Sequence, residues 1–225
     1  MIVAERKPLA DVMTMLAPYK NICVLGCGTC VTVCLAGGQK EAEETAAAIN
    51  LHFKNEGKDV NVEAFTIERQ CEYEFIDEVL ERLKGFDVIL SLACGVGVQT
   101  IVDHVPELIA LPGLNTQFFG YPVEQGVWTE NCLGCGDCVL HITQGICPIT
   151  RCSKSILNGP CGGSQDGVCE ISKDVPCAWH LIHERLSKVG KVKDLDEIQP
   201  PKDWSTSHHG GVRTIVREDV KLDRG

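Results

Sequence analysis

The chain has 225 residues, a length typical of one or two domains. It is 44% hydrophobic and 23% charged, as a globular protein usually is, but it contains 14 cysteines. The formal net charge is −10 and there is no run of Lys or Arg, so a nucleic-acid-binding protein, which needs a basic surface, is not expected. No stretch approaches about 18 apolar residues without charges, so the sequence predicts no membrane span.

The cysteines are the unusual feature of the composition. The N-terminal segment carries Glu5, Arg6 and Lys7 among its apolar residues, which argues against a signal peptide and favours a cytoplasmic protein. Disulfide scaffolds are typical of short secreted chains, so a disulfide framework is not expected here. The cysteines are instead expected to be thiolate ligands of metal ions or iron–sulfur clusters.

The first part of the chain alternates between predicted strands and helices. In chain order, hydrophobic periodicity predicts a helix over 5–18, a strand over 21–26, a helix over 40–55, a strand over 59–67, a helix over 76–83, a strand over 86–93, a helix over 98–105 and a weaker strand over 116–119. This alternation is typical of an open parallel sheet with right-handed crossovers. We therefore expect residues 1–127 to form one α/β domain.

The pattern changes after this domain. Residues 128–190 contain eight cysteines and many glycines but little periodicity, so we expect a small ferredoxin-like domain stapled by metal and closed by a helix over 178–189. Residues 191–225 contain two adjacent prolines and many charges, and they are predicted to form an extended arm. Trp204 is a candidate anchor of this arm on a partner, the alternative being a partly ordered tail.

Five cysteines follow the predicted parallel strands. Cys27, Cys30 and Cys34 come after the first strand, Cys71 lies past the second and Cys94 past the third. The carboxyl ends of parallel strands form one edge of a sheet, where ligands bind. We expect Cys27, Cys71 and Cys94 to hold a cluster there, with either Cys30 or Cys34 as the fourth ligand. Tetrahedral zinc is the rival metal, because it accepts the same four thiolates.

Glycines surround these cysteines. We expect the backbone N–H groups of Gly26, Gly28, Gly95 and Gly97 to approach the cluster and bond to its sulfurs. A dinucleotide-binding loop is a weak alternative, because the third glycine position of that fingerprint is occupied by Val31. Cys23 lies inside the predicted strand and is expected to be a buried, inert thiol.

The clearest motif lies in the cysteine-rich segment. Cys132-x2-Cys135-x2-Cys138 followed by Cys147-Pro148 resembles the bacterial ferredoxin pattern that holds [4Fe–4S] clusters. Eight residues instead of three precede the Cys-Pro pair, and the fourth cysteine of the ferredoxin pattern ligates the other cluster. Cys147 is therefore a candidate ligand both for the cluster of this loop and for the second set of cysteines described next.

The remaining four cysteines make up a second set. Their spacing fits no common zinc template, since zinc sites usually use two close pairs. The eight cysteines of the segment thus equal two complete sets of four. We expect iron–sulfur in at least one of them, with zinc in the second set as the main alternative. The second set is Cys152, Cys161, Cys169 and Cys177.

Longer motifs carry a family resemblance. The run GICPITRCSKSILNGPCGGSQDGVCE, followed by CAWHLIHERL, resembles the C-terminal domain associated with methylenetetrahydrofolate reductases. Together with GCGTCVTVCLAGG and CLGCGDC upstream, the chain resembles the small iron–sulfur subunit (the MetV type) of this reductase from acetogenic bacteria. The resemblance covers about residues 15–190.

The resemblance implies a function and a set of partners. It implies a non-catalytic subunit, with no catalytic residues of its own, that relays electrons from an external donor, such as ferredoxin or a heterodisulfide-reductase-like complex, to the flavin of a TIM-barrel partner. That partner holds the folate and reduces methylene- to methyltetrahydrofolate. The chain itself is expected to carry two to three [4Fe–4S] clusters, with zinc possible in one set and flavin only on the partner.

The resemblance also implies which cysteines of this chain are ligands, and it leaves open whether Cys34 is one of them. An alternative is a structural zinc scaffold of the same reductase without electron transfer. A third hypothesis, a catalytic enzyme with an open iron in one cluster, is disfavoured by the spare cysteine. The ligands carried over are Cys27, Cys30, Cys71, Cys94, Cys132, Cys135, Cys138, Cys147, Cys152, Cys161, Cys169 and Cys177.

Overall fold

The computed structural model describes residues 1–217 and 219–221, so the end of the predicted arm lies partly outside the described residues. The chain divides into two compact units, Met1–Thr129 and Glu130–Gly225, here called the N-terminal and C-terminal units. The cysteine-rich segment and the described part of the arm both belong to the C-terminal unit.

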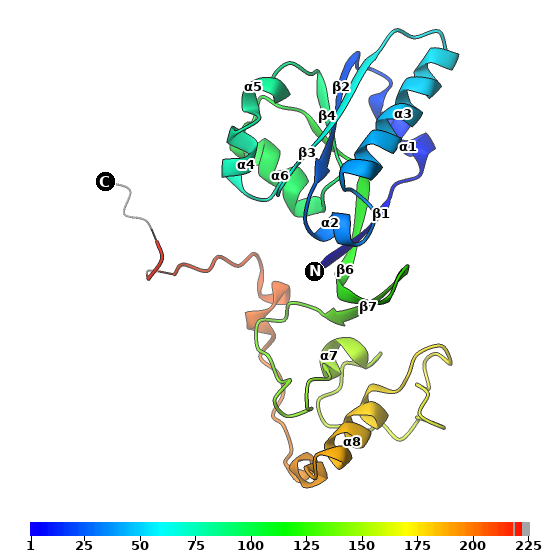
Figure 1. The fold of residues 1–225 in the computed structure, drawn as a ribbon. Helices are drawn as coiled ribbons and strands as arrows, with labels where there is room; N and C mark the ends of the chain where they lie inside the picture. Colours follow the sequence, from blue (N-terminus) through cyan, green and yellow to red (C-terminus); the bar gives the residue numbers. More distant parts are fainter. Residues whose placement is uncertain (218, 222–225) are drawn as a thin grey trace. The chain divides into compact units, whose positions relative to one another are not determined.

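The N-terminal unit is built on a four-stranded parallel sheet, which confirms the α/β prediction (Figure 1). Its strands lie in the order β3-β2-β4-β5, with β2 paired to β3 on one side and to β4 on the other. The central position of β2 places the segments that follow β3 and β4 on either side of its own carboxyl end. The strands are β2 Asn21–Cys27, β3 Asn61–Ile67, β4 Val88–Ser91 and β5 Ala110–Pro112.

Helices cover both faces of this sheet (Figure 1). Successive side chains of β2 point to opposite faces, so Ile22 and Val24 join one apolar core while Cys23 and Leu25 join the other. The first core contains residues of α1 and α3, and the second contains residues of α4, α5 and α6. The helices are α1 Leu9–Leu16, α2 Cys30–Val33, α3 Gln39–Asn55, α4 Tyr73–Asp77, α5 Leu80–Leu83 and α6 Gly95–His104.

Two local predictions were correct only in part. The helix expected over 5–18 begins only at Leu9, because β1 Ile2–Arg6 pairs antiparallel with β6 Leu114–Glu124 and buries Val3 and Ala4. The strand expected over 116–119 is part of β6, which belongs with β1 and β7 Val127–Cys132 to a second sheet. Both errors concern partners that are distant in sequence, which local periodicity does not reveal.

The C-terminal unit contains little regular structure among its described residues. Two helices and three 3₁₀ turns are separated by loops, and a small core gathers Ile146, Cys177, Trp179, Ile182 and Leu186. The ferredoxin-like part of the fold prediction stays a prediction. The elements are α7 Pro148–Arg151, α8 Ala178–Lys188, η1 Val192–Asp196, η2 Trp204–Thr206 and η3 His208–Gly210.

A helix that crosses a bilayer must be both long and apolar. Within residues 1–217 and 219–221, no helix meets both requirements.

Ile182→Ala should destabilise the C-terminal unit selectively. Ile182 is completely buried in the small core of this unit, and truncating such a side chain costs about 2–5 kcal/mol. Hydrogen exchange under native conditions should show faster exchange in α8 and unchanged exchange in β2 and α3. Val189→Ala, at a 48% exposed position directly after the same helix, is the control and should have little effect. Equal effects of the two substitutions would contradict the assigned core.

Candidate metal centres

Three of the predicted ligands follow three neighbouring strands. Cys27 ends β2 and Cys71 follows β3. Cys94 lies in the short connection between β4 and α6, immediately before the first residue of α6. Because these strands are parallel and adjacent, the three thiols lie at the same edge of the sheet, called here the rim. Desolvation raises the pKa of the Cys71 thiol, and the proximity of Cys27 and Cys94 raises it further. The Cys71 thiol is therefore close enough to Cys27 and to Cys94 to interact with each of them electrostatically.

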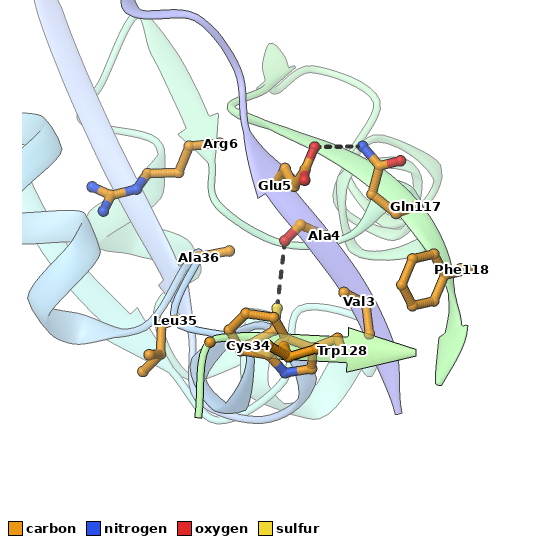
Figure 2. Close-up of a pocket in the computed structure, with 12 residues that line it drawn as sticks. Val3, Ala4, Glu5, Arg6, Cys34, Leu35, Ala36, Gln117, Phe118 and Trp128 are labelled. Atoms are coloured by element: carbon orange, nitrogen blue, oxygen red, sulfur yellow. Dashed lines mark hydrogen bonds between the residues drawn. The ribbon is translucent and has the colours of Figure 1, made fainter. Parts of the chain in front are cut away.

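Cys30 and Cys34 have different surroundings. Cys30 is the first residue of α2 and is half-buried, whereas Cys34 is only 6% exposed within the apolar core. The Cys34 Sγ lies 3.6 Å from the Ala4 carbonyl oxygen of β1, as Figure 2 shows. Burial raises the pKa of the Cys34 thiol. The Cys34 thiol thus contacts the backbone of β1.

Cys23 differs from all of these cysteines. It lies in the middle of β2 and is completely buried. Burial raises the pKa of its thiol to about 12, so the thiol stays protonated and is a poor ligand at neutral pH.

The buried amide of Gln70 connects the three segments that carry the rim thiols. Its Nε2 donates to the carbonyl oxygens of Leu25, at 2.8 Å, and Gly26, at 3.0 Å, just before Cys27. Its Oε1 accepts from the Ser91 hydroxyl at 2.6 Å, and that hydroxyl accepts from the Ala93 N–H, just before Cys94. Gln70 itself directly precedes Cys71 and is completely buried. One side chain therefore fixes the positions of all three cysteine-bearing segments.

Gln70 is not recognisable from the sequence as a site residue. It is neutral and belongs to no known motif, so neither charge nor spacing marks it. The available signal was weak: Ser91 interrupts an apolar strand, and a buried hydroxyl needs a hydrogen-bond partner.

The rim glycines do not all act as expected. The Gly28 N–H donates to the carbonyl oxygens of Ile67 and Glu68, and the Gly95 N–H donates to the Thr116 hydroxyl at 2.8 Å. These donors already have protein acceptors and are not directed at a cluster sulfur. Gly97 has a packing role instead, because a Cβ there would lie 2.9 Å from the Cβ of Gln70.

The CLGCGDC loop, residues 132–138, leaves β7 and turns through two glycines with positive φ, Gly134 and Gly136. Its Cys132 Sγ already accepts a hydrogen bond from the Gly134 N–H at 3.4 Å. Cys132 and Cys138 are exposed and Cys135 is half-buried. This arrangement presents three thiols from one tight loop, as a ferredoxin-type pattern requires. Cys147 stands at the start of α7, with its Sγ 3.7 Å from the Thr150 hydroxyl.

The four cysteines of the second set line one cavity. They come from separate loops, and backbone hydrogen bonds hold these loops against each other. The Cys177 N–H donates to the Gly167 carbonyl, and the Cys169 N–H donates to the Val175 carbonyl. Lys154 lies on the same cavity wall and forms an ion pair with Glu170. The cavity-lining cysteines are Cys152, Cys161, Cys169 and Cys177.

The cavity also has a polar and an aromatic wall. A hydrogen bond with the Ser153 hydroxyl lowers the pKa of the Cys169 thiol, and the Lys154 charge lowers it further. Trp179 closes one side, with its indole N–H bonded to the Ile156 carbonyl oxygen at 3.1 Å. A Cβ at Gly159 would lie 2.4 Å from the Trp179 ring, so the first glycine of the NGPCGG motif cannot be replaced by a larger residue without moving this ring.

The chemistry of the donor sets suits the metals that they are predicted to bind. All fourteen cysteines are free thiols, and thiolates are the ligands that zinc and iron–sulfur clusters prefer. Among residues 1–217 and 219–221, no three His, Cys, Asp or Glu side chains converge closely enough to hold a single metal ion. The thiolates of a [4Fe–4S] cluster bind different irons and need not converge on one ion. The donor chemistry therefore fits a cluster, and the assignment of individual ligands stays a prediction.

Gln70→Leu should loosen the rim while leaving the sheet folded. The substitution removes two hydrogen bonds to backbone carbonyls and leaves the buried Ser91 hydroxyl without its acceptor, at a cost of about 1–3 kcal/mol. Chemical denaturation should report this loss, and alkylation of Cys71 should become faster. Gln99→Leu, which removes one exposed bond to the Gly95 carbonyl, is the matched control. Unchanged stability and unchanged Cys71 reactivity in Gln70→Leu would show that the amide does not order the rim.

Comparison with known proteins gives one match. Residues 111–205 match the family model described as the methylene-tetrahydrofolate reductase C terminal, which covers less than half of the chain. The match includes all eight cysteines from Cys132 to Cys177 and excludes the rim cysteines. Searches of curated proteins and of solved structures returned no match. The matched region links the chain to methylenetetrahydrofolate reductases and supports an oxidoreductase-related protein.

Proposed function

We propose that this chain is an iron–sulfur subunit that delivers electrons to a methylenetetrahydrofolate reductase partner. The observation that carries the proposal is the cavity lined by Cys152, Cys161, Cys169 and Cys177, which lies within the region matching the reductase family. Four thiols from separate loops that meet at one cavity are typical of a metal or cluster site. The CLGCGDC loop, with Cys147, provides the second proposed set.

A third site is proposed at the rim. Its ligands are Cys27, Cys71 and Cys94, and Cys30 is the proposed fourth ligand because the Cys34 thiol is directed at β1. Gln70 orders the three segments before any metal binds, so this site requires little rearrangement of the backbone. The rim cysteines lie outside the region that matches the family, so their assignment rests on geometry alone.

The proposed reaction needs a partner protein. Reduction of a methylene to a methyl group on the folate takes two electrons and two protons. A [4Fe–4S] cluster supplies a one-electron carrier, and a flavin on the partner combines single electrons into pairs. We propose that a flavin-binding TIM-barrel subunit holds both flavin and folate, and that an external donor such as ferredoxin or a heterodisulfide-reductase-like complex supplies the electrons.

The residues of this chain have supporting roles in the proposal. Lys154 provides positive charge beside the thiolates of the second set, and the Ser153 hydroxyl bonds to Cys169. Trp179 and Ile182 close the apolar side of the same region and limit access of water. Hydrogen bonds, charge and burial of this kind set the reduction potential of a cluster.

Metal analysis of cysteine variants tests this proposal. Anaerobically reconstituted chain should contain about twelve irons if all three sets hold [4Fe–4S], or about eight irons and one zinc if one set is structural. Cys161→Ala should remove about four irons or the single zinc from this total. Cys23→Ala, at the buried thiol inside β2, should leave the metal content unchanged.

The same measurement separates the proposal from its alternative. A colourless chain with bound zinc and fewer than about four irons would support the structural zinc scaffold and contradict electron transfer. Equal losses of iron in Cys161→Ala and Cys23→Ala would contradict the ligand assignment.

A further inference from the structure

The described part of the C-terminal arm folds back on the CLGCGDC loop of its own unit. Three side chains of the arm donate to three carbonyl oxygens of this loop: Lys202 to Asp137 at 2.7 Å, Thr206 to Cys135 at 2.9 Å and Arg213 to Gly134 at 3.0 Å. The contacts join residues between 65 and 79 positions apart in sequence. The arm segment 199–213 is called the clasp below.

Lys202 is the most buried contact of the clasp. Its side chain is only 2% exposed, and besides the carbonyl its Nζ lies 3.4 Å from the carboxylate of Asp137. A buried ammonium group is costly unless it is paired and hydrogen-bonded, as this one is. The Lys202 side chain is therefore a buried, ordered contact of the loop, whereas the other described lysines of the arm are exposed to solvent.

The backbone of the clasp also lies against the loop. A Cβ at Gly136 would lie 2.0 Å from the Thr206 carbonyl oxygen, so only glycine permits this approach. At its start, the clasp is held by Asn158 of the NGPCGG motif. The Asn158 amide donates to the Gln199 carbonyl at 2.8 Å and accepts from the Gln199 N–H at 2.7 Å.

We propose that the clasp fixes the conformation of the CLGCGDC loop and offsets its negative charge, with Lys202 and Arg213 as positioning residues. This inference rests on the proposed function where it concerns a bound cluster. Thiolates and a cluster bring net negative charge to the loop of a chain that already carries −10. Two cations that bond to the loop's carbonyls stabilise that charge and hold the three thiols in place.

Trp204 also takes part in the contacts of the clasp with its own unit. Trp204 lies within η2 and contacts His209 edge-on, at 5.4 Å between ring centroids, and its anchoring on a partner stays a prediction. It lines a groove of the same unit together with Ile149 and Ile156. The described arm is therefore packed on its own unit by both polar and apolar contacts.

Thiol reactivity in the metal-free full chain tests the clasp directly. Lys202→Met and Arg213→Met remove one cation each. Alkylation of Cys135 is followed by peptide mass spectrometry over a range of pH, so that the rate constant of the thiolate is separated from any change in the pKa of the thiol. This rate constant should become roughly tenfold larger, because the loosened loop exposes the thiol. Thr206→Val removes only the hydroxyl bond to the Cys135 carbonyl and should give a smaller increase. Lys193→Met, in the exposed turn η1, is the charge-matched control and should leave the rate unchanged.

A second readout uses the reconstituted chain. In Lys202→Met and Arg213→Met the midpoint potential of the loop's cluster should fall, because the lost cation no longer stabilises the more negative reduced state. The midpoint potential of the control Lys193→Met should equal that of the parent chain. An unchanged rate constant for the Cys135 thiolate in the three clasp variants would overturn the inference, whatever the metal content. Faster alkylation in a chain that never binds iron would support the clasp and contradict the proposed function instead.

Discussion

The parallel pairing of β2 with β3 and β4 is the constraint on which the proposed rim site depends. Parallel strands bring their carboxyl ends to one edge, so segments distant in sequence deliver Cys27, Cys71 and Cys94 to the same place. The pairing alone does not fix the loops beyond the strand ends. Gln70 does so by bonding to the segments before Cys27 and Cys94, and its complete burial makes these bonds difficult to exchange for water.

The cysteine-bearing loops of the C-terminal unit are ordered by different contacts. Its small core around Ile182 and Trp179 is too limited to order the long cysteine-bearing loops by apolar burial alone. Polar contacts take over part of this role, as in the Asn158–Gln199 pair and the bonds from Lys202 and Arg213. In the proposed function, bound metal would supply the rest of the stabilisation, as in other small metal-binding domains.

Sequence reasoning succeeded where a feature is local. The helix α3 and the strand β2 were predicted nearly to their ends, because apolar spacing and flanking glycines mark them within a short window. It missed β1 and assigned the strand within β6 to the wrong sheet, because β1 and β6 pair with each other across more than a hundred residues. The same holds for the rim: the strand ends were predictable, but the direction of Cys34 depends on β1, and Gln70 carries no recognisable pattern.

The central claim, that this chain passes electrons to a reductase flavin, is tested most directly by rapid mixing. Reduced, iron-loaded chain would be mixed anaerobically with the flavin-loaded reductase partner while flavin absorbance is followed. The account predicts that the flavin is bleached as the chain is reoxidised, and that chain stripped of metal produces no bleaching. A flavin that stays oxidised in the presence of reduced, iron-loaded and partner-bound chain would contradict the account.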